Sequence, residues 1–441
     1  MNADIINENQ SGEDSRRKFL KKLGIMGSIP FLPASIPAFG SAMNAEAAIG
    51  TVDVTHSGQE KSIIGQYGPW VASLPEDPSP LSFRNSRWTR VDAWKDMAMK
   101  KFLELTASPD IGRVPQVTVG RKYSYDGLEI EEIVWQLPFG RPTEAIVLKP
   151  LGASGRLPAI LGLHDHGGNK YLGKRKITRT GDNIPEFVIA HQEESYEGKA
   201  WANEIAKRGY VVMVHDAFAF GSRRIMYKDV GGIPWGPCNV DGKSDADPEN
   251  PDNIIAYNNW AGEHEHILSK SLFCGGTTWP GVFLAEDRAA LDVLRSRDDV
   301  DPERIGCGGL SGGGLRTVYL AGSDRRIKCS VCVGFMSTWK DFLLNKSYTH
   351  TWMTYTPLLP KYLDFPEILG LRVPLPAMAL NNNEDPLYTL PEMQRADRML
   401  RDIYAKAGVP ENYKSGFYPG GHKFDIKMQK EAFDWFDRWL K

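Results

Sequence analysis

One serine of the chain stands where it could act as a nucleophile. Ser311 lies within residues 309–313, whose sequence GLSGG fits the pattern G-x-S-x-G. These residues directly follow a predicted buried strand at 304–308 and directly precede a predicted helix at 312–320. A serine in such a tight strand-to-helix turn has strained backbone angles, which small neighbours permit, and its hydroxyl stands at a helix N-terminus. The pattern is common in Gly-rich chains, but this context predicts a nucleophile.

A serine needs a base to remove its proton, and an acid to orient that base. His422 follows the last predicted strand, at 414–418, and precedes the last predicted helix. Asp385 follows the predicted strand at 377–380. Parallel strands end at one edge of a sheet, so we expect both side chains to reach Ser311 from that edge. Two other carboxylates remain open as the acid: Glu384, which is adjacent, and Asp341, which follows the preceding strand.

Acyl transfer through a serine also needs hydrogen-bond donors for the oxyanion. Gly312 would supply one backbone N–H. The second should come from the loop after the predicted strand at 157–163, where the sequence reads HDHGG over residues 164–168. Gly167 and Gly168 are both candidates there, and the sequence does not decide between them.

These residues need a scaffold of alternating elements. From residue 157 onward, apolar strand-like runs alternate with amphipathic helical runs, which is typical of a mostly parallel sheet with helices on both faces. Strands are predicted at 157–163, 210–214, 304–308, 328–335, 377–380 and 414–418, and helices at 201–208 (the end of one), 284–296, 312–320, 390–407 and 426–440. A helix at 88–106 and strand-like runs at 117–125 and 130–148 precede them. Two long stretches, 217–280 and 336–374, interrupt the rhythm, and loops of that length are usually functional covers.

Taken together, residues ~115–441 resemble the α/β-hydrolase superfamily, and within it the dienelactone-hydrolase-like and acetyl xylan esterase-like branch. The order Ser311, Asp385, His422 is the order of that fold. The resemblance implies hydrolysis of a carboxylic ester through an acyl-enzyme, with no metal or organic cofactor. The substrate would be a small-molecule or carbohydrate ester, such as an acetylated polysaccharide. Two departures limit the transfer: dienelactone hydrolases use Cys where Ser311 stands, and acetyl xylan esterases often have Gln where Gly312 stands.

The first residues resemble an export signal. Residues 15–21 read SRRKFLK and precede a weakly apolar run to about residue 42, a pattern similar to the twin-arginine signal. Cleavage is predicted after Ala42 or Ala47, so we divide the chain into a signal at 1–47, an arm and helix at 48–114, and a hydrolase domain at 115–441. The precursor would then use the twin-arginine export machinery, and the mature protein would be periplasmic or secreted without stable membrane insertion.

Charge and cysteine content restrict the function further. The 441 residues carry a formal net charge of −2, which gives no electrostatic footprint for nucleic acid. Of five cysteines, Cys238 and Cys274 lie in one insertion and could form a disulfide. Cys329 and Cys332 lie three apart on a predicted buried strand, so they should point to opposite faces.

Two alternatives remain. His164, His166, His264 and His266 together are raw material for a metal-dependent hydrolase, although the Asp-His pair that a binuclear site needs after His-x-His is replaced here by Gly-Gly. The other alternative is a catalytically inactive hydrolase fold that serves as a binding module.

Overall fold

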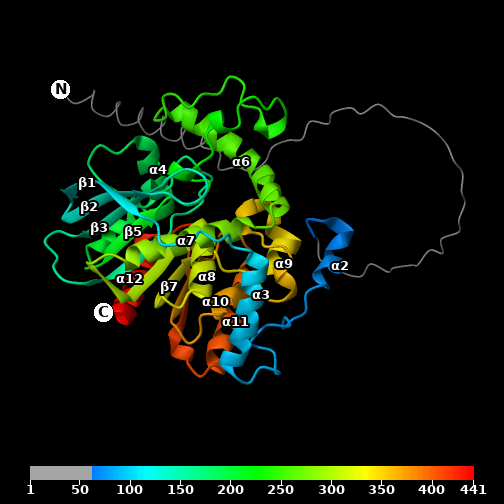
Figure 1. Cartoon of the computed structure of the whole chain (residues 1–441). Coiled ribbons are helices and arrows are strands. Elements are labelled where there is room, and N and C mark those ends of the chain that lie inside the picture. The colour runs from blue at the N-terminus through cyan, green and yellow to red at the C-terminus, as the bar shows by residue number, and fades with distance from the viewer. Residues whose placement is uncertain (1–61) are drawn as a thin grey trace, which may run out of the picture.

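The computed structural model describes residues 62–441, so the predicted export signal and its cleavage sites lie outside the described residues. Nine strands form one sheet in the order β1-β2-β3-β5-β4-β6-β7-β8-β9 (Figure 1). The first three are antiparallel, and β3 pairs antiparallel with β5; from β5 to β9 all pairs are parallel. The strands are β1 (Val117–Tyr125), β2 (Leu128–Trp135), β3 (Thr143–Pro150), β4 (Leu157–Gly162), β5 (Val211–His215), β6 (Val300–Leu310), β7 (Cys329–Val333), β8 (Ala377–Asn382) and β9 (Tyr413–Tyr418).

Strands β4, β5, β7 and β8 in the middle of the sheet are mainly apolar and buried on both faces, whereas the edge strand β1 is largely exposed. Side chains alternate between two cores: Ala159 and Leu161 of β4 belong to one, and Ile160 to the other. The first core lies between one face of the sheet and the helices that cover it. The second core lies on the opposite face of the sheet, which the helices at 201–206 and 426–440 cover. The helices are α3 (Val91–Thr106), α4 (Glu186–Tyr196), α5 (Trp201–Ala206), α6 (Pro251–Cys274), α7 (Trp279–Arg295), α8 (Gly312–Ser323), α10 (Phe365–Gly370), α11 (Leu390–Lys406) and α12 (Ile426–Leu440), with the short α2 (Gly68–Ala72) and α9 (Trp339–Asp341).

This is the α/β-hydrolase fold, and the predicted fold class is confirmed. Two details differ from the sequence prediction. The run predicted at 130–148 is two strands, β2 and β3, because residues 136–142 form a Pro- and Gly-containing connection. Helix α4 was not predicted, because its buried face includes the polar residues His191 and Gln192, so apolar residues alone do not mark that face. The division of the chain at residues 47 and 114 stays a prediction.

Both predicted insertions are built mainly of helical segments. The first carries α6, whose N-cap Asn250 accepts hydrogen bonds from the N–H groups of Asp252 and Asn253, with Pro251 in the first turn. Its 24 residues span about 36 Å at 1.5 Å per residue. The second insertion is a series of short turns from α9 to α10. Figure 1 shows α6 across the end of the molecule and extending toward α9.

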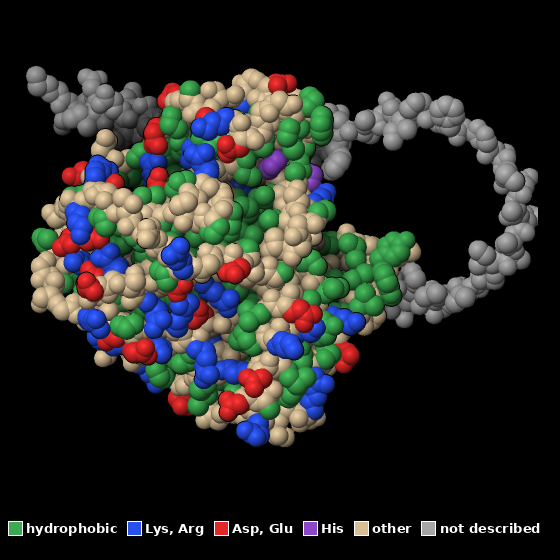
Figure 2. Space-filling view, in the orientation of Figure 1, with side chains coloured by type: hydrophobic (Ala, Val, Ile, Leu, Met, Phe, Trp, Pro, Cys, Tyr) green, Lys and Arg blue, Asp and Glu red, His purple; other side chains and the backbone are tan. Residues whose placement is uncertain are grey.

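All five cysteines lie in the described part of the chain and all are free, so the disulfide considered between Cys238 and Cys274 is not formed. Cys329 and Cys332 are fully buried in separate cores, as their spacing predicted. Over residues 62–441, no helix combines the length and apolarity that crossing a membrane requires. The face in Figure 2 carries interspersed basic and acidic side chains, while hydrophobic side chains gather over α2, where Tyr67, Trp70 and Leu74 are exposed.

Candidate active site

Ser311 occupies a strained turn between β6 and α8. Its φ is 58° and its ψ is −120°, a combination that a residue with a Cβ rarely adopts. Its N–H donates to the carbonyl of Val333 on β7 at 2.8 Å, and its own carbonyl accepts from Leu315 at 2.9 Å, which fixes the turn from both sides. The side chain stands at the N-terminus of α8, where the helix dipole favours negative charge. The local geometry is a strained strand-to-helix turn, as the sequence predicted.

The glycines of this turn are required by a close approach of the loop that follows β4. A Cβ on Gly313 would lie 2.0 Å from the carbonyl oxygen of Leu163, and one on Gly309 would lie 2.1 Å from the same atom. Neither contact is possible, because the atom they would meet belongs to the backbone. The G-x-S-x-G sequence therefore lets the turn pack directly on the residues after β4.

Asp385 and His422 are hydrogen-bonded to each other. Nδ1 of His422 lies 2.6 Å from Oδ2 of Asp385, so Nδ1–H donates and Nε2 is left as the basic nitrogen. The other oxygen of Asp385 accepts from the N–H of Leu387 at 2.9 Å. Asp385 is almost fully buried, whereas the His422 side chain is 20% exposed. An imidazole held in this tautomer by a buried carboxylate can take a proton at Nε2.

The two alternative acids do not contact His422. Asp341 accepts from Ser337 Oγ and from the backbone and side chain of Thr389, all within 2.9 Å, so its carboxylate is used to hold the start of α11. For Glu384 the structure gives a backbone contact, from its N–H to the carbonyl of Gly420 at 3.1 Å. The carboxylate that meets the imidazole is that of Asp385.

Gly334 connects the serine side of the site with the histidine side. It follows Val333, the acceptor of the Ser311 N–H, and a Cβ placed on it would lie 3.0 Å from Cε1 of His422. Nε2 of His422 is buried and has no hydrogen-bond partner among residues 62–441. Catalytic hydrogen bonds are often long in ligand-free structures and tighten when substrate binds. The structure thus brings Ser311 and His422 to one place without a hydrogen bond between them.

The loop after β4 reaches the N-terminus of α8. A Cβ on Gly312 would lie 2.8 Å from the backbone nitrogen of His166, so this amide is beside Gly312. The N–H of Gly168 donates to Nδ1 of His166 at 3.1 Å and is engaged within the loop. Among the three loop amides, that of His166 was not considered from the sequence, because a residue with a side chain carries no glycine signal.

Two buried charged residues, Lys176 and Asp165, hold this loop in place. Nζ of Lys176 donates to the carbonyls of Asp165 and His166 at 2.7 Å each. Burial lowers the pKa of Lys176 to about 8, against the attraction of Asp165. Burial opposes ionisation of Asp165 as well, but Lys176 and His191 outweigh it and hold the pKa of Asp165 well below its ordinary value. Tyr196 also donates to Asp165. The loop is therefore held by a buried cluster of side chains whose charges compensate one another.

A second histidine lies near the pair, on the second insertion. Nε2 of His350 donates to the carbonyl of Leu387 at 3.0 Å, two residues after Asp385. Burial lowers the pKa of His350 to about 4, so the ring is neutral near pH 7. Its ring packs against Phe335, Phe342 and Tyr388. Nothing in the sequence distinguishes this histidine from any other in a long insertion.

The four histidines considered as metal ligands are engaged separately. His164 accepts from the N–H of Ala217 at 3.2 Å, and His166 contacts Glu265 at 2.7 Å. His264 stacks on Trp260, and His266 contacts Lys270. Between residues 62 and 441, no three or more His, Cys, Asp or Glu side chains are grouped so that they could hold a metal ion.

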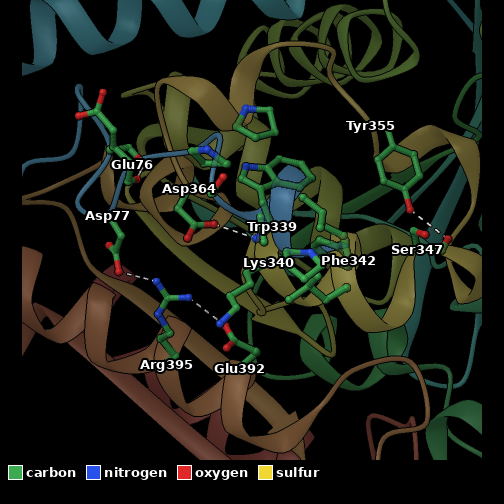
Figure 3. A pocket seen from close by; sticks show the side chains of 18 residues that line it. Glu76, Asp77, Trp339, Lys340, Phe342, Ser347, Tyr355, Asp364, Glu392 and Arg395 are labelled. Carbon is green, nitrogen blue, oxygen red and sulfur yellow. Dashed lines mark hydrogen bonds and ion pairs between the residues drawn. The ribbon is translucent and has the colours of Figure 1, made fainter. Parts of the chain in front are cut away.

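A cavity of about 860 Å³ lies away from Ser311, between residues 69–79 and the second insertion (Figure 3). Its wall includes an ion-paired chain in which Arg395 contacts both Asp77 and Glu392. Trp339 and Phe342 form an aromatic part of the wall. None of Ser311, Asp385 and His422 lines this cavity, so it is distinct from the site around Ser311.

Known proteins resemble this chain over most of its length. No family model matches. YtaP of Bacillus subtilis (strain 168), provisionally named a hydrolase, is 26% identical over 314 residues, which cover 70% of this chain and 88% of YtaP. A Bacteroides fragilis protein provisionally named an acetyl xylan esterase superposes with a TM-score of 0.58 at 18% identity, covering 83% of this chain and 84% of its own. A glucuronoyl esterase from Solibacter usitatus gives a TM-score of 0.52 at 13% identity, covering 82% and 97%. At these identities the solved structures establish that this chain shares their α/β-hydrolase fold.

Proposed function

We propose that this protein is a serine esterase that hydrolyses a carboxylic ester through an acyl-enzyme, with Ser311 as nucleophile, His422 as base and Asp385 as the orienting acid. The observation that carries the proposal is the combination of a strained Ser311 at the N-terminus of α8 with a His422–Asp385 pair at 2.6 Å on the same edge of the sheet. A structural turn has no need of strained angles, nor of an imidazole whose Nε2 is left unpartnered.

The reaction follows from these positions. Nε2 of His422 accepts the Ser311 proton while Oγ attacks the ester carbonyl, and Asp385 stabilises the imidazolium that forms. The oxyanion is held by the N–H of Gly312 and by one amide of the loop after β4. Gly167 remains a candidate for the second donor, whereas the N–H of Gly168 would first have to leave Nδ1 of His166. The position of the His166 amide beside Gly312 adds it as a further candidate. His422 then protonates the leaving alcohol, and water attacks the acyl-enzyme in the second half.

For the substrate, we propose an ester of a carbohydrate, such as an acetylated polysaccharide. Proteins of the same fold that superpose over more than four fifths of this chain are named as an acetyl xylan esterase and a glucuronoyl esterase. We also propose that residues 1–47 direct export through the twin-arginine pathway, which would bring the enzyme to extracytoplasmic polysaccharide.

The experiment that tests the mechanism is hydrolysis of p-nitrophenyl acetate by the full chain and by Ser311→Ala, each with and without a chelator. We expect Ser311→Ala to lose about 10⁴- to 10⁶-fold in kcat, as serine hydrolases do when the nucleophile is removed. A chelator should leave the wild type unchanged. Activity that survives the substitution and disappears with the chelator would overturn the proposal.

A second panel tests the substrate class. Release of acetate from acetylated xylan is compared with release of alcohol from a methyl glucuronate ester and with hydrolysis of p-nitrophenyl acetate. We expect the acetylated polysaccharide to give the highest kcat/KM. A higher value for the glucuronate ester would indicate that the carbohydrate supplies the acid of the ester rather than the alcohol. It would leave the serine mechanism in place.

A further inference from the structure

One buried carboxylate joins three segments around the proposed site. Glu265 lies on α6 of the first insertion. Its Oε1 accepts from Nε2 of His166 at 2.7 Å, and its Oε2 accepts from Thr351 Oγ1 at 2.7 Å and from the N–H of Trp352 at 3.1 Å. Nζ of Lys170 is ion-paired with Oε1. The carboxylate thus links the loop after β4 to the second insertion.

Three contacts bear on the tautomer of His166. Since the N–H of Gly168 donates to Nδ1, that nitrogen carries no proton, and Nε2–H is the donor to Glu265. Nζ of Lys170 lies 2.9 Å from the same Nε2, and because an ammonium can only donate, both groups are directed at the carboxylate of Glu265. Burial lowers the pKa of His166, and the nearby Lys170 ammonium lowers it further, so the ring is neutral. Burial disfavours the charged form of Glu265, but Lys170 and His166 overcome this and lower the pKa of the carboxyl. The arrangement is a neutral imidazole between an amide and a carboxylate.

His166 is held at both its ends. Glu265 fixes the tip of the ring, and Lys176 fixes the carbonyl through a 2.7 Å hydrogen bond. The backbone nitrogen that lies beside Gly312 belongs to this same doubly held residue. A donor that must meet an oxyanion has to be placed to within a few tenths of an ångström, because electrostatic stabilisation depends on geometry prepared in advance.

The second insertion connects this anchor with the acid side of the site. Lys346 donates to the carbonyl of Pro386 at 2.7 Å, and His350 donates to the carbonyl of Leu387 at 3.0 Å. The next two residues of the same segment, Thr351 and Trp352, donate to Glu265. We call residues 346–352 the strap, since one end holds the loop that carries Asp385 and the other end holds Glu265.

We propose that Glu265 is a positioning residue of the esterase site: through His166 and the strap it sets the loop after β4 in register with Ser311 and Asp385. This proposal rests on the proposed function, since it assigns Glu265 a part in the same reaction. Glu265 does not touch the reacting atoms. It acts through the ring of His166, whose amide is beside Gly312, and through Thr351.

The competing explanation is that Glu265 and Lys170 are only a buried ion pair that stabilises the fold. Both side chains are at least nine-tenths buried, so removing one charge would strand the other. Removing both and replacing them with apolar side chains of similar volume is often tolerated. A comparison of the single with the double variant therefore separates an effect on stability from an effect on positioning.

The experiment therefore compares the full chain with Glu265→Met, with the double variant Lys170→Met/Glu265→Met, and with Thr351→Val, a near-isosteric change that removes one hydrogen bond to Glu265. Asp397→Asn is the matched control, because Asp397 is also a buried carboxylate, with a 3.0 Å hydrogen bond from Tyr413 at the N-terminal end of β9, the end opposite the site. Tm, kcat and KM for p-nitrophenyl acetate are measured, and a fluorophosphonate probe counts reactive Ser311.

We expect Glu265→Met to lower both Tm and kcat. The double variant should recover most of the Tm and still show kcat at least tenfold below wild type with KM changed less than threefold, because an interaction made in the transition state is lost. Thr351→Val should lower kcat several-fold at near wild-type Tm, and Asp397→Asn should lower Tm alone. Wild-type kcat in the double variant or in Thr351→Val would overturn the proposal. An inactive wild type that the probe does not label would instead overturn the proposed function.

Discussion

Three carboxylates compete for the role of acid at the scale of single residues, and hydrogen bonding separates them. Asp385 meets Nδ1 of His422 at 2.6 Å, whereas Asp341 is occupied by Ser337 and Thr389. We expect Asp385→Asn to lower kcat by about 10²- to 10⁴-fold with little change in Tm, because an amide favours the wrong imidazole tautomer. Steady-state kinetics on p-nitrophenyl acetate measure this.

Asp341→Asn is the control for that prediction. It should leave kcat within about threefold and reduce the free energy of unfolding by roughly 1–3 kcal/mol, since a charged hydrogen-bond network at the start of α11 is weakened. If Asp341→Asn were the variant that lost activity, the acid would have to be reassigned.

A residue of the candidate site could be predicted where the neighbouring residues in the sequence mark its position. Ser311, Asp385 and His422 each follow a predicted strand directly, so their common edge could be inferred from the sequence, and the structure does bring Asp385 to His422. Glu265 and the His166 amide had no such signal. Glu265 reaches His166 from a helix 99 residues later in the chain, and a contact of that kind depends on tertiary packing.

At the scale of elements, the turn before α8 packs directly against the backbone of the residues after β4, which leaves no room for a larger side chain. We expect Gly313→Ala to reduce the free energy of unfolding by at least ~2 kcal/mol, because its Cβ would lie 2.0 Å from the carbonyl oxygen of Leu163 and the backbone must shift. Urea denaturation measures the change. Labelling of Ser311 by a fluorophosphonate should decrease in the same variant, and an unchanged free energy with normal labelling would contradict the packing of the turn.

In helix α6, by contrast, a glycine has space for a side chain. Gly262 lies in its interior, is exposed, and has no atom within 4 Å of a Cβ placed on it. We expect Gly262→Ala to raise the free energy of unfolding by about 0.5–1 kcal/mol, because alanine loses less backbone entropy on forming a helix. Urea denaturation at constant kcat checks this. A destabilised Gly262→Ala would indicate that this face of α6 is covered.

The elements of the sheet were the most predictable part of the fold. Buried parallel strands are continuous apolar runs, and each was located within a few residues of its position. The insertions were not, because α6 is stabilised by Tyr257 and Trp260 packing on Tyr227 rather than by a regular apolar stripe. The antiparallel β2 and β3 were merged in the prediction, since both are rich in apolar residues and only seven residues separate them.

At the scale of the whole molecule, the segment before α3 is attached to the rest of the fold through hydrogen bonds of Arg84 and Trp94. Arg84 contacts Asp77 at 2.8 Å and Glu367 of α10 at 3.1 Å. Glu367 also closes the N-terminus of α10 by accepting from the N–H of Asp364 at 2.8 Å. The Trp94 indole of α3 donates to the carbonyl of Leu81 at 2.7 Å, which adds a neutral attachment. One buried carboxyl, Glu367, therefore takes part in both the helix cap and the attachment.

Burial raises the pKa of Glu367 from 4.5 to about 7, against the attraction of Arg84. Below pH 4.5 the carboxyl is protonated in both the folded and the unfolded chain. Between pH 4.5 and 7 the unfolded chain ionises while the folded chain keeps the proton, so its stabilising contribution is lost as the pH rises. We expect the free energy of unfolding of the wild type to fall by about 3 kcal/mol over this window relative to Glu367→Gln, which mimics the protonated form. Urea denaturation at several pH values measures this, with Glu411→Gln at an exposed position as control, and a constant difference between wild type and Glu367→Gln would show that Arg84 keeps Glu367 ionised throughout.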